Sequence, residues 1–341
     1  MGSWNNEVVT TTATEDGRWS VKLSTPGAGG PHQITIHGEN FVPIRNVFSG
    51  EVWICSGQSN MEGHAVVDLD HEEHYNGGRG NLEKLLEDPQ WQPRLSHLRD
   101  KNGEWTSRDD VFVRYRPSRG PLKKGPLSIG FAVHEGRHHF GPELQIGHRL
   151  GQASKDPVLL IKTCWGGKSL HVDFRPPSAG GETGPYYKKM LREIREALKN
   201  LEKDFPQLAG RKPVISGFFW FQGWNDMYVD GALDNYSQNF LHLVDDLRKE
   251  FNVPRLPVII GQTGNADNTR LHAAQEAPSK SPKHKGTIVY VPTRQFRYKA
   301  ENSPNKTHGH HWFGHAGRYF EAGDAMGKAM VELISGKKSK R

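Results

Sequence analysis

Four short polar stretches carry the residue types that acyl transfer needs, and most of them directly follow an apolar run. Acyl transfer requires a nucleophilic hydroxyl, a base, and N–H donors where the oxyanion forms. Ser59 is the candidate nucleophile and His311 the candidate base. The four stretches are Gly57-Gln58-Ser59-Asn60, Trp165-Gly166-Gly167-Lys168-Ser169, Gln222-Gly223-Trp224-Asn225-Asp226 and His308-Gly309-His310-His311-Trp312.

Each candidate residue has a definite chemical use. Ser59 stands where a helix is expected to begin, and the positive potential there favours developing negative charge. Gly167 lets a bare backbone N–H approach a substrate, and the side chain of Asn225 adds a second donor. His311 would accept the serine proton and return it to the leaving alcohol. Turns, helix caps and surface histidines explain each stretch singly, but their joint occurrence favours catalysis.

The elements that must position these residues follow from the hydrophobic pattern. Near-continuous apolar runs alternate with amphipathic helical patterns, which predicts a parallel sheet covered on both faces. We therefore expect an α/β fold: a three-layer, doubly wound sheet of about five parallel strands, with reactive residues at the carboxyl ends. The strands are expected at 51–56, 157–164, 216–223, 257–262 and 287–292, and the helices at 142–152, 186–205, 235–251 and 318–335.

The remaining segments suggest a domain plan. Residues 1–50 hold short β-like runs, "WSVKL", "HQITIHG" and "FVPIRNV", too few to close a sandwich. We interpret them as an N-terminal β segment, the remnant of an accessory β-sandwich. The main domain is expected at 51–335, with an insertion at about 64–130 over the site, and 336–341 form a basic tail.

Composition narrows the function classes. The net charge is +7, but 45 basic and 38 acidic residues are well mixed, which disfavours a nucleic-acid partner. Two cysteines, Cys55 and Cys164, exclude a disulfide scaffold. We expect no membrane partner because no apolar run reaches about 18 residues. The first residues do not read as a signal peptide.

The order Ser, Gly, Asn, His resembles the SGNH hydrolase superfamily, and "VWICSGQSNMEG" is similar to its sialate O-acetylesterase-like carbohydrate esterases. "KTCWGGKSL", "FGPEL" and "FWFQGWND" extend the resemblance over about 45–335. It implies an SGNH/flavodoxin-like fold, Ser59 as nucleophile, an oxyanion hole of Ser59, Gly167 and Asn225, and His311 as base. It also implies removal of acetyl groups from sugars without metal or cofactor, by secreted or periplasmic proteins.

Two departures from the family pattern leave roles open. Many relatives carry Asp three residues before the histidine, where this chain has His308. A backbone carbonyl, His308 or Asp226 could orient the base, and Asp226 could equally stabilise its own loop. Many relatives also read Gln-Gly-Glu-Ser where this chain has Gln222-Gly223-Trp224-Asn225. The expected substrate-lining residues are Gln58, Trp165, Gln222, Trp224 and Arg175, and the two tryptophans favour short acyl groups.

Parts of the sequence are also compatible with two other classes of function. "HEEH" at 71–74 and "HGHH" at 308–311 invite a metal hypothesis, but neither has the His-Glu-x-x-His spacing or an obvious third ligand. We therefore expect no metal. The alternative is a glycan-binding protein with a degenerate esterase site, suggested by the missing Asp and nine tryptophans. The joint presence of Ser59, Gly167, Asn225 and His311 argues against such decay.

Overall fold

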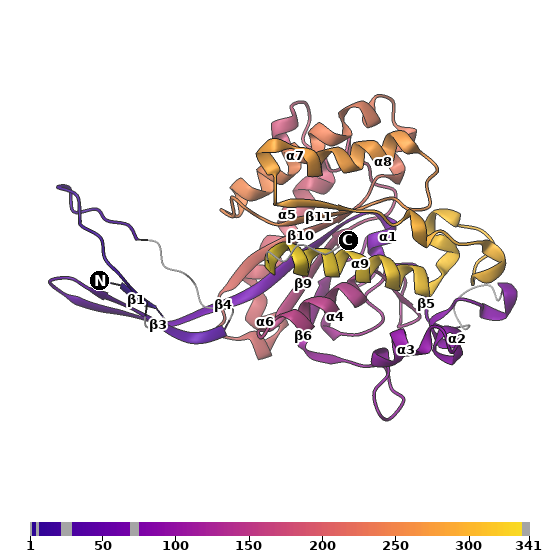
Figure 1. Cartoon of the computed structure of the whole chain (residues 1–341), viewed down its shortest axis with the longest axis horizontal. Coiled ribbons are helices and arrows are strands. Elements are labelled where there is room, and N and C mark those ends of the chain that lie inside the picture. The colour runs from indigo at the N-terminus through magenta and orange to yellow at the C-terminus, as the bar shows by residue number, and fades with distance from the viewer. Residues whose placement is uncertain (1, 5–6, 22–28, 69–74, 336–341) are drawn as a thin grey trace.

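A mixed β-sheet forms the middle layer of the protein (Figure 1). The computed structural model describes residues 2–4, 7–21, 29–68 and 75–335. Within these residues the central sheet has the order β12-β11-β10-β4-β9-β6-β7, parallel except for the edge strand β7. The strands are β4 (Phe41–Gly57), β6 (Arg108–Tyr115), β7 (Lys123–Leu127), β9 (Val158–Cys164), β10 (Pro213–Phe221), β11 (Val258–Gly261) and β12 (Ile288–Val291).

The five strands expected from the sequence are all present, as β4, β9, β10, β11 and β12. They are ordered β9-β4-β10-β11-β12, which is the 2-1-3-4-5 order of flavodoxin-like sheets. The predicted doubly wound α/β fold is therefore confirmed. In this order the chain changes direction across the sheet between β4 and β10, which is where such folds bind their ligands.

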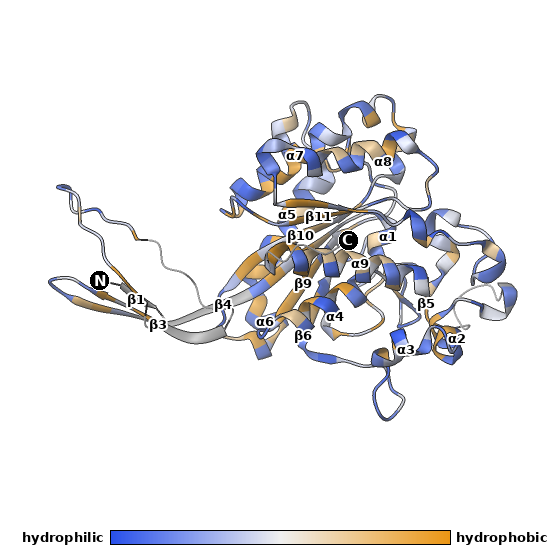
Figure 2. Cartoon of the chain, in the orientation of Figure 1, coloured by the Kyte–Doolittle hydropathy of each residue, from blue (hydrophilic) through white to orange (hydrophobic). Residues whose placement is uncertain are grey.

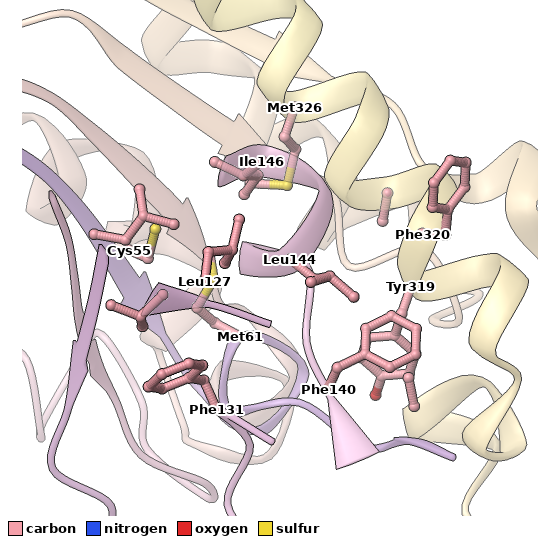
Figure 3. Packing of buried hydrophobic residues seen from close by; sticks show 14 of the residues in the cluster. Cys55, Met61, Leu127, Phe131, Phe140, Leu144, Ile146, Tyr319, Phe320 and Met326 are labelled. Carbon is pink, nitrogen blue, oxygen red and sulfur yellow. The ribbon is translucent and has the colours of Figure 1, made fainter. Parts of the chain in front are cut away.

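Helices cover both faces of the sheet. On one face α4 (Glu143–Ala153) packs against α9 (Ala316–Ser335). The other face is covered by α5 (Pro185–Lys199), α7 (Ala232–Glu250) and α8 (Thr269–Glu276). Figure 2 shows the sheet strands as mainly hydrophobic, and Figure 3 shows Ile146 and Leu144 of α4 beside Met326 and Phe320 of α9.

Alternation along β4 explains why its sequence reads as a continuous apolar run. Trp53 and Cys55 enter the cluster beneath α4 and α9, whereas Val52 and Ile54 enter the cluster beneath α5 and α7. All four side chains are at most 2% exposed. A strand buried on both faces needs apolar residues at every position.

The expected insertion at about 64–130 is only partly an insertion. Its second half contributes β6 and β7 to the sheet, and β6 pairs in parallel with β9. The strand signal of β6 is weakened by Arg114, which is 3% exposed and forms ion pairs with Glu193 and Asp204. A charged residue inside a core strand interrupts the apolar pattern. Its burial requires ion-pair partners, and these cannot be identified beforehand because they lie far away in the sequence.

The N-terminal strands form an antiparallel extension of the sheet. β3 (Gly29–His37) pairs with the first half of β4, and β1 (Gly2–Trp4) joins β3 to β2 (Glu7–Val9). Figure 1 shows these strands projecting away from the helices. The boundary expected at residue 50 falls inside the single strand β4. Trp19–Val21 of the expected first β run has no regular structure.

Shorter elements complete the described chain. They are α1 (Ser59–Glu62), α2 (Leu82–Glu87), α3 (Gln92–Leu95), α6 (Leu201–Asp204), β5 (Ala65–Val66) and β8 (His139–Phe140). β5 pairs with β8 as a two-stranded sheet. No helix in the described ranges has the length and apolar character needed to cross a membrane. The basic tail at 336–341 lies outside the described residues.

Candidate active site

The carboxyl ends of β4 and β10 meet at two glycines that no other residue could replace without movement. Gly57 has φ +146°, and a Cβ there would lie 2.2 Å from the carbonyl oxygen of Phe221. Gly223 has φ +155°, and a Cβ there would lie 2.7 Å from Nε2 of Gln275. The N–H of Gln58 donates to the carbonyl of Phe221 at 3.2 Å. The two strand ends are thus joined directly before Ser59 and Asn225.

Ser59 is the first residue of α1, and its side chain is partly exposed. No described residue hydrogen-bonds to its hydroxyl. Because α1 has only four residues, it contributes less positive potential at Ser59 than a longer helix would. Other features of the site must therefore stabilise an oxyanion.

Gln58 organises the strand ends instead of lining a surface. Its side chain is 3% exposed, so the lining role expected for it does not fit its position. Its Oε1 accepts from the backbone N–H of Gly223 at 3.1 Å, and its Nε2 donates to Oδ1 of Asn225 at 2.9 Å. Since Oδ1 of Asn225 is engaged, the Asn225 amide presents Nδ2 as a donor, as an oxyanion hole requires.

Gly167 lies on an exposed loop that two buried carboxylates hold. The Gly167 backbone has φ +70°, with open space where a Cβ would lie. Glu62 accepts from the N–H of Gly166 and from Tyr115 Oη, the latter at 3.0 Å. Burial raises the pKa of Glu62. A Cβ on Gly166 would approach Oε2 of Glu62 at 2.8 Å, so the loop passes close to the turn that bears Ser59.

Asp226 is the second of these carboxylates, and it does not contact the candidate base. It accepts from the backbone N–H groups of Leu170 and His171, at 2.9 and 3.0 Å, and from Nε2 of Gln222 at 2.5 Å. Burial raises the pKa of Asp226. Gln222 also donates to the carbonyl of Lys168 at 3.0 Å. Of the two roles open for Asp226, its contacts fit the stabilisation of a loop. Gln222 is buried beside Asp226, so it does not line a substrate cleft as expected.

His311 lies in the irregular turn Gly309–Gly314 that precedes α9. Nδ2 of Asn60 donates to the carbonyl of His310 at 3.0 Å, and Oδ1 of Asn60 accepts from Tyr319 Oη at 2.8 Å. Asn60 therefore fastens the histidine turn to α1, one residue after Ser59. Burial, aided by neighbouring histidines, lowers the pKa of His311 to about 3.

No carboxylate among the described residues hydrogen-bonds to the His311 ring. His308 is exposed, with φ +62°, and its Nδ1 lies 3.1 Å from Oγ1 of Thr307. The His308 ring lies 6.1 Å from that of His311. The ring of His64 instead stacks on His311, with centroids 3.9 Å apart and planes 7° apart. Sequence reasoning missed His64 because its spacing from Ser59 matches no motif.

Two further lining residues have other positions than expected. Trp165 is 0% exposed and packs against Phe174 and Tyr186 in the core, so it does not limit acyl length at a surface. Arg175 donates to the carbonyls of Gly180 and His171, at 2.7 and 3.2 Å, and holds its own loop.

Trp224 does line a pocket. The pocket has a volume of about 580 Å³ and lies between the end of β10 and the histidine turn. The centroid of the Trp224 ring lies 5.5 Å from that of His310 and 6.3 Å from that of Tyr228, which is 71% exposed. The pocket is lined by Trp224, Asn265, Arg297, Tyr298, Lys299, Ala300, Glu301, Gly309, His310, Trp312 and Phe313.

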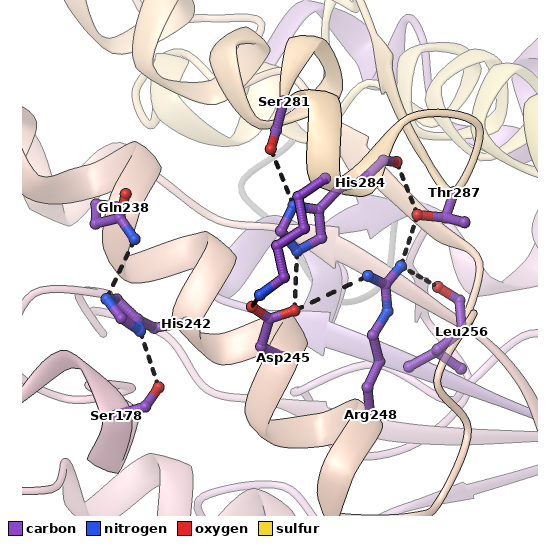
Figure 4. Close-up of polar contacts among 10 residues, drawn as sticks. Ser178, Gln238, His242, Asp245, Arg248, Leu256, Ser281, His284 and Thr287 are labelled. Atoms are coloured by element: carbon purple, nitrogen blue, oxygen red, sulfur yellow. Dashed lines mark hydrogen bonds and ion pairs between the residues drawn. The ribbon is translucent and has the colours of Figure 1, made fainter.

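A second serine, histidine and aspartate lie in a row beside α7 (Figure 4). Ser281 Oγ is 3.0 Å from Nδ1 of His284, and Nε2 of His284 is 2.8 Å from Asp245. A catalytic triad bonds serine to Nε2 and aspartate to Nδ1, so the nitrogens are reversed here. Ser281 is only three residues from His284, and the row holds a turn against α7.

No set of three or more His, Cys, Asp or Glu side chains in the described ranges is arranged to hold a metal ion. His71 and His74 of the "HEEH" motif lie outside the described residues. His308, His310 and His311 of the second motif gather by ring contacts instead.

The 2-1-3-4-5 strand order and the polar strand ends define a flavodoxin-like α/β fold. The chain belongs to the carbohydrate esterase family described as sialic acid-specific acetylesterase, which residues 49–322 match. This finding confirms the family expected from "VWICSGQSNMEG".

The chain is also similar to known proteins in sequence and in fold. Sialate O-acetylesterase of Mus musculus is 23% identical over an alignment of 283 positions that covers 72% of this chain and 48% of that protein. The chain thus spans about half the length of this curated relative. A structure from Arabidopsis thaliana has a TM-score of 0.52 at 15% identity and covers 83% of this chain and 98% of its own. NanS has a TM-score of 0.51 at 14% identity, with coverages of 84% and 98%.

Proposed function

We propose that this protein is a serine esterase that removes O-acetyl groups from carbohydrates through an acyl-enzyme. The observation that carries the proposal is the pair of amide side chains flanking Ser59. Gln58 bonds to Asn225 at the end of β10, and Asn60 bonds to the backbone of the histidine turn. The two neighbours of the candidate nucleophile are thereby bonded to a candidate oxyanion donor and to the turn that carries the candidate base.

The chemistry follows from these groups. Ser59 Oγ attacks the acetyl carbonyl while His311 takes its proton, and the oxyanion accepts from the N–H groups of Ser59 and Gly167 and from Nδ2 of Asn225. Collapse of the intermediate expels the sugar alcohol, to which His311 returns the proton. Water then attacks the acetyl ester on Ser59 by the same route and releases acetate.

The pocket beside Trp224 supports a sugar as the alcohol part of the substrate. It offers aromatic faces from Trp224, Tyr298 and Phe313 together with polar groups from Asn265 and Lys299. Aromatic faces with a few polar groups suit a sugar ring, which has both apolar faces and hydroxyls. The family resemblance also supports secretion or a periplasmic location.

Acetate release by wild-type protein and Ser59→Ala tests the proposal. Acetylated xylan, O-acetylated sialic acid, acetylated marine polysaccharide fragments and p-nitrophenyl acetate are the substrates. Wild type should release acetate, and Ser59→Ala should retain its fold and lose nearly all turnover. Ser56→Ala is the matched control, because Ser56 is buried and its hydroxyl donates to the carbonyl of Thr163 at 2.9 Å. An active Ser59→Ala would refute the serine mechanism.

The second candidate is a glycan-binding protein without turnover. The pocket would bind the glycan, and no described carboxylate bonds to His311 to orient it as a base. A wild-type chain that binds acetylated glycans in calorimetry but releases no acetate would establish it. Serine-directed inactivation gives the same distinction, since it blocks turnover only in an esterase.

A further inference from the structure

His64 occupies a fixed place beside the candidate base. It follows Gly63, where φ is +100° and a Cβ would lie 2.6 Å from the backbone nitrogen of Gly141. It precedes β5, which pairs with β8. The segment after α1 is therefore held closely, and it presents the His64 ring face to face with His311.

His64 is itself supported from behind. Its Nδ1 lies 3.1 Å from Nε2 of His134, and the His134 ring lies 4.0 Å from that of His139 on β8. Lys123 fixes the loop that carries His134, because its Nζ donates to the carbonyls of Gly130 and Ala132 at 2.9 Å each. The row of rings His311, His64 and His134 is thus held at its far end by His139 of strand β8.

We propose that His64 is a positioning residue for the esterase reaction: its ring stacks on His311 and holds that imidazole in the plane needed to serve Ser59. This inference rests on the proposed function. It assigns to an aromatic face the orienting role that a carboxylate fills in a Ser-His-Asp triad. His308 stands where many relatives carry the aspartate, and its ring centroid lies 6.1 Å from that of His311.

The charge states agree with this role. A hydrogen bond between two imidazole nitrogens needs one donor and one acceptor, and a neutral His64 ring can accept from His134 at Nδ1. Burial lowers the pKa of His64 far below its ordinary value, with help from His311, His134, His139 and His310.

Two substitutions of His64 separate stacking from general packing. His64→Ala removes the ring and should lower kcat roughly 10- to 100-fold, because the base is no longer aligned, with KM changed by less than about threefold. His64→Phe keeps an aromatic face and should restore most of that loss. His97→Ala is the matched control: it removes a ring 4.7 Å from His148, away from the strand ends, and should leave kcat unchanged.

The His311 titration gives a readout that is independent of turnover. The ring resonances of His311, followed by NMR in the intact chain, should titrate at higher pH in His64→Ala, since water gains access, and as in wild type in His64→Phe. An unchanged kcat and an unchanged midpoint in His64→Ala would overturn the proposal, as would a kcat loss in His64→Phe equal to that in His64→Ala. If wild type releases no acetate while the midpoint still moves, the proposed function fails and the stacking role stands.

Discussion

The amide side chains beside Ser59 explain how a short turn can assemble a site from three distant parts of the chain. Gln58 is buried and reaches the segment after β10, while Asn60 is buried and reaches the segment before α9. Buried amides of this kind are costly unless both their donor and acceptor atoms find partners. Their polarity at the end of an apolar strand is accounted for by these bonds.

We expect Asn225→Ala to lower kcat by roughly 10² to 10³, about 2.7–4 kcal/mol of transition-state stabilisation, with a smaller effect on KM. The reason is the loss of the Nδ2 donor that Gln58 orients. Steady-state kinetics on p-nitrophenyl acetate measure both constants. Gln58→Ala should lower kcat in the same direction without removing the donor itself. A wild-type kcat in Asn225→Ala would leave Asn225 as a loop residue only.

The histidine turn yields a second prediction for single residues. His311→Ala should abolish turnover as completely as Ser59→Ala, and the double variant should be no worse, because the two side chains act as one unit. His308→Ala should cost at most about tenfold, since its exposed ring lies 6.1 Å from that of His311. Rates of acetate release on one substrate decide the matter. An active His311→Ala beside an inactive His308→Ala or His310→Ala would move the base to the other residue.

Among the elements, β4 does most to position Ser59, which follows its carboxyl end. Its first half pairs with β3 and its second half lies between β9 and β10. Behind the site the fully buried Lys162 of β9 pairs with Glu143 of α4 at 2.8 Å and donates to the carbonyl of Glu62 at 2.9 Å. This pair joins the sheet, a covering helix and the end of α1.

The close approach of β4 and β10 predicts a large effect of Gly57→Ala. The added methyl group would meet the carbonyl of Phe221 at 2.2 Å, so the variant should lose more than about 3 kcal/mol of the free energy of unfolding. Gly210→Ala is the control: it has φ +74° but nothing within 4 Å, so only the backbone strain of about 1–2 kcal/mol applies. Urea unfolding measures both. Equal losses in the two variants would contradict the contact argument.

For the whole molecule, buried histidines make stability depend on pH. His148 and His315 are 3% and 2% exposed, and burial lowers the pKa of each to about 3. The unfolded chain binds protons at these sites below about pH 6.5, whereas the folded chain does not. Stability is therefore present above about pH 6.5 and falls by up to about 1.4 kcal/mol per pH unit for each histidine as the pH drops toward 3.

His148→Gln should flatten this dependence. Its free energy of unfolding, measured in urea between pH 5 and 7.5, should fall less steeply than that of wild type, by up to about 1.4 kcal/mol per pH unit. His242→Gln serves as the control for losing a histidine from a partly exposed position, where the ring bonds to Ser178 (Figure 4). Parallel curves for wild type and His148→Gln would refute the assignment.

The sequence by itself determined the fold class, the five central strands, most of the long helices and the family. Apolar runs such as 51–56 and 157–164 record burial on both faces of a sheet, which is a local property of the chain. The short motifs at the strand ends were readable for the same reason, because glycines and polar residues must stand where a buried strand stops.

Only the tertiary structure decided what each side chain touches. In the structure Trp165 is buried, and Asp226 accepts from backbone N–H groups of the 168–171 loop. Arg114 pairs with Asp204, so β6 can be a buried strand, and His64 stacks on His311. Each of these contacts joins residues that are distant in the chain or belong to different elements. A pattern along the sequence reports the periodicity of one element, whereas a contact depends on how two elements pack.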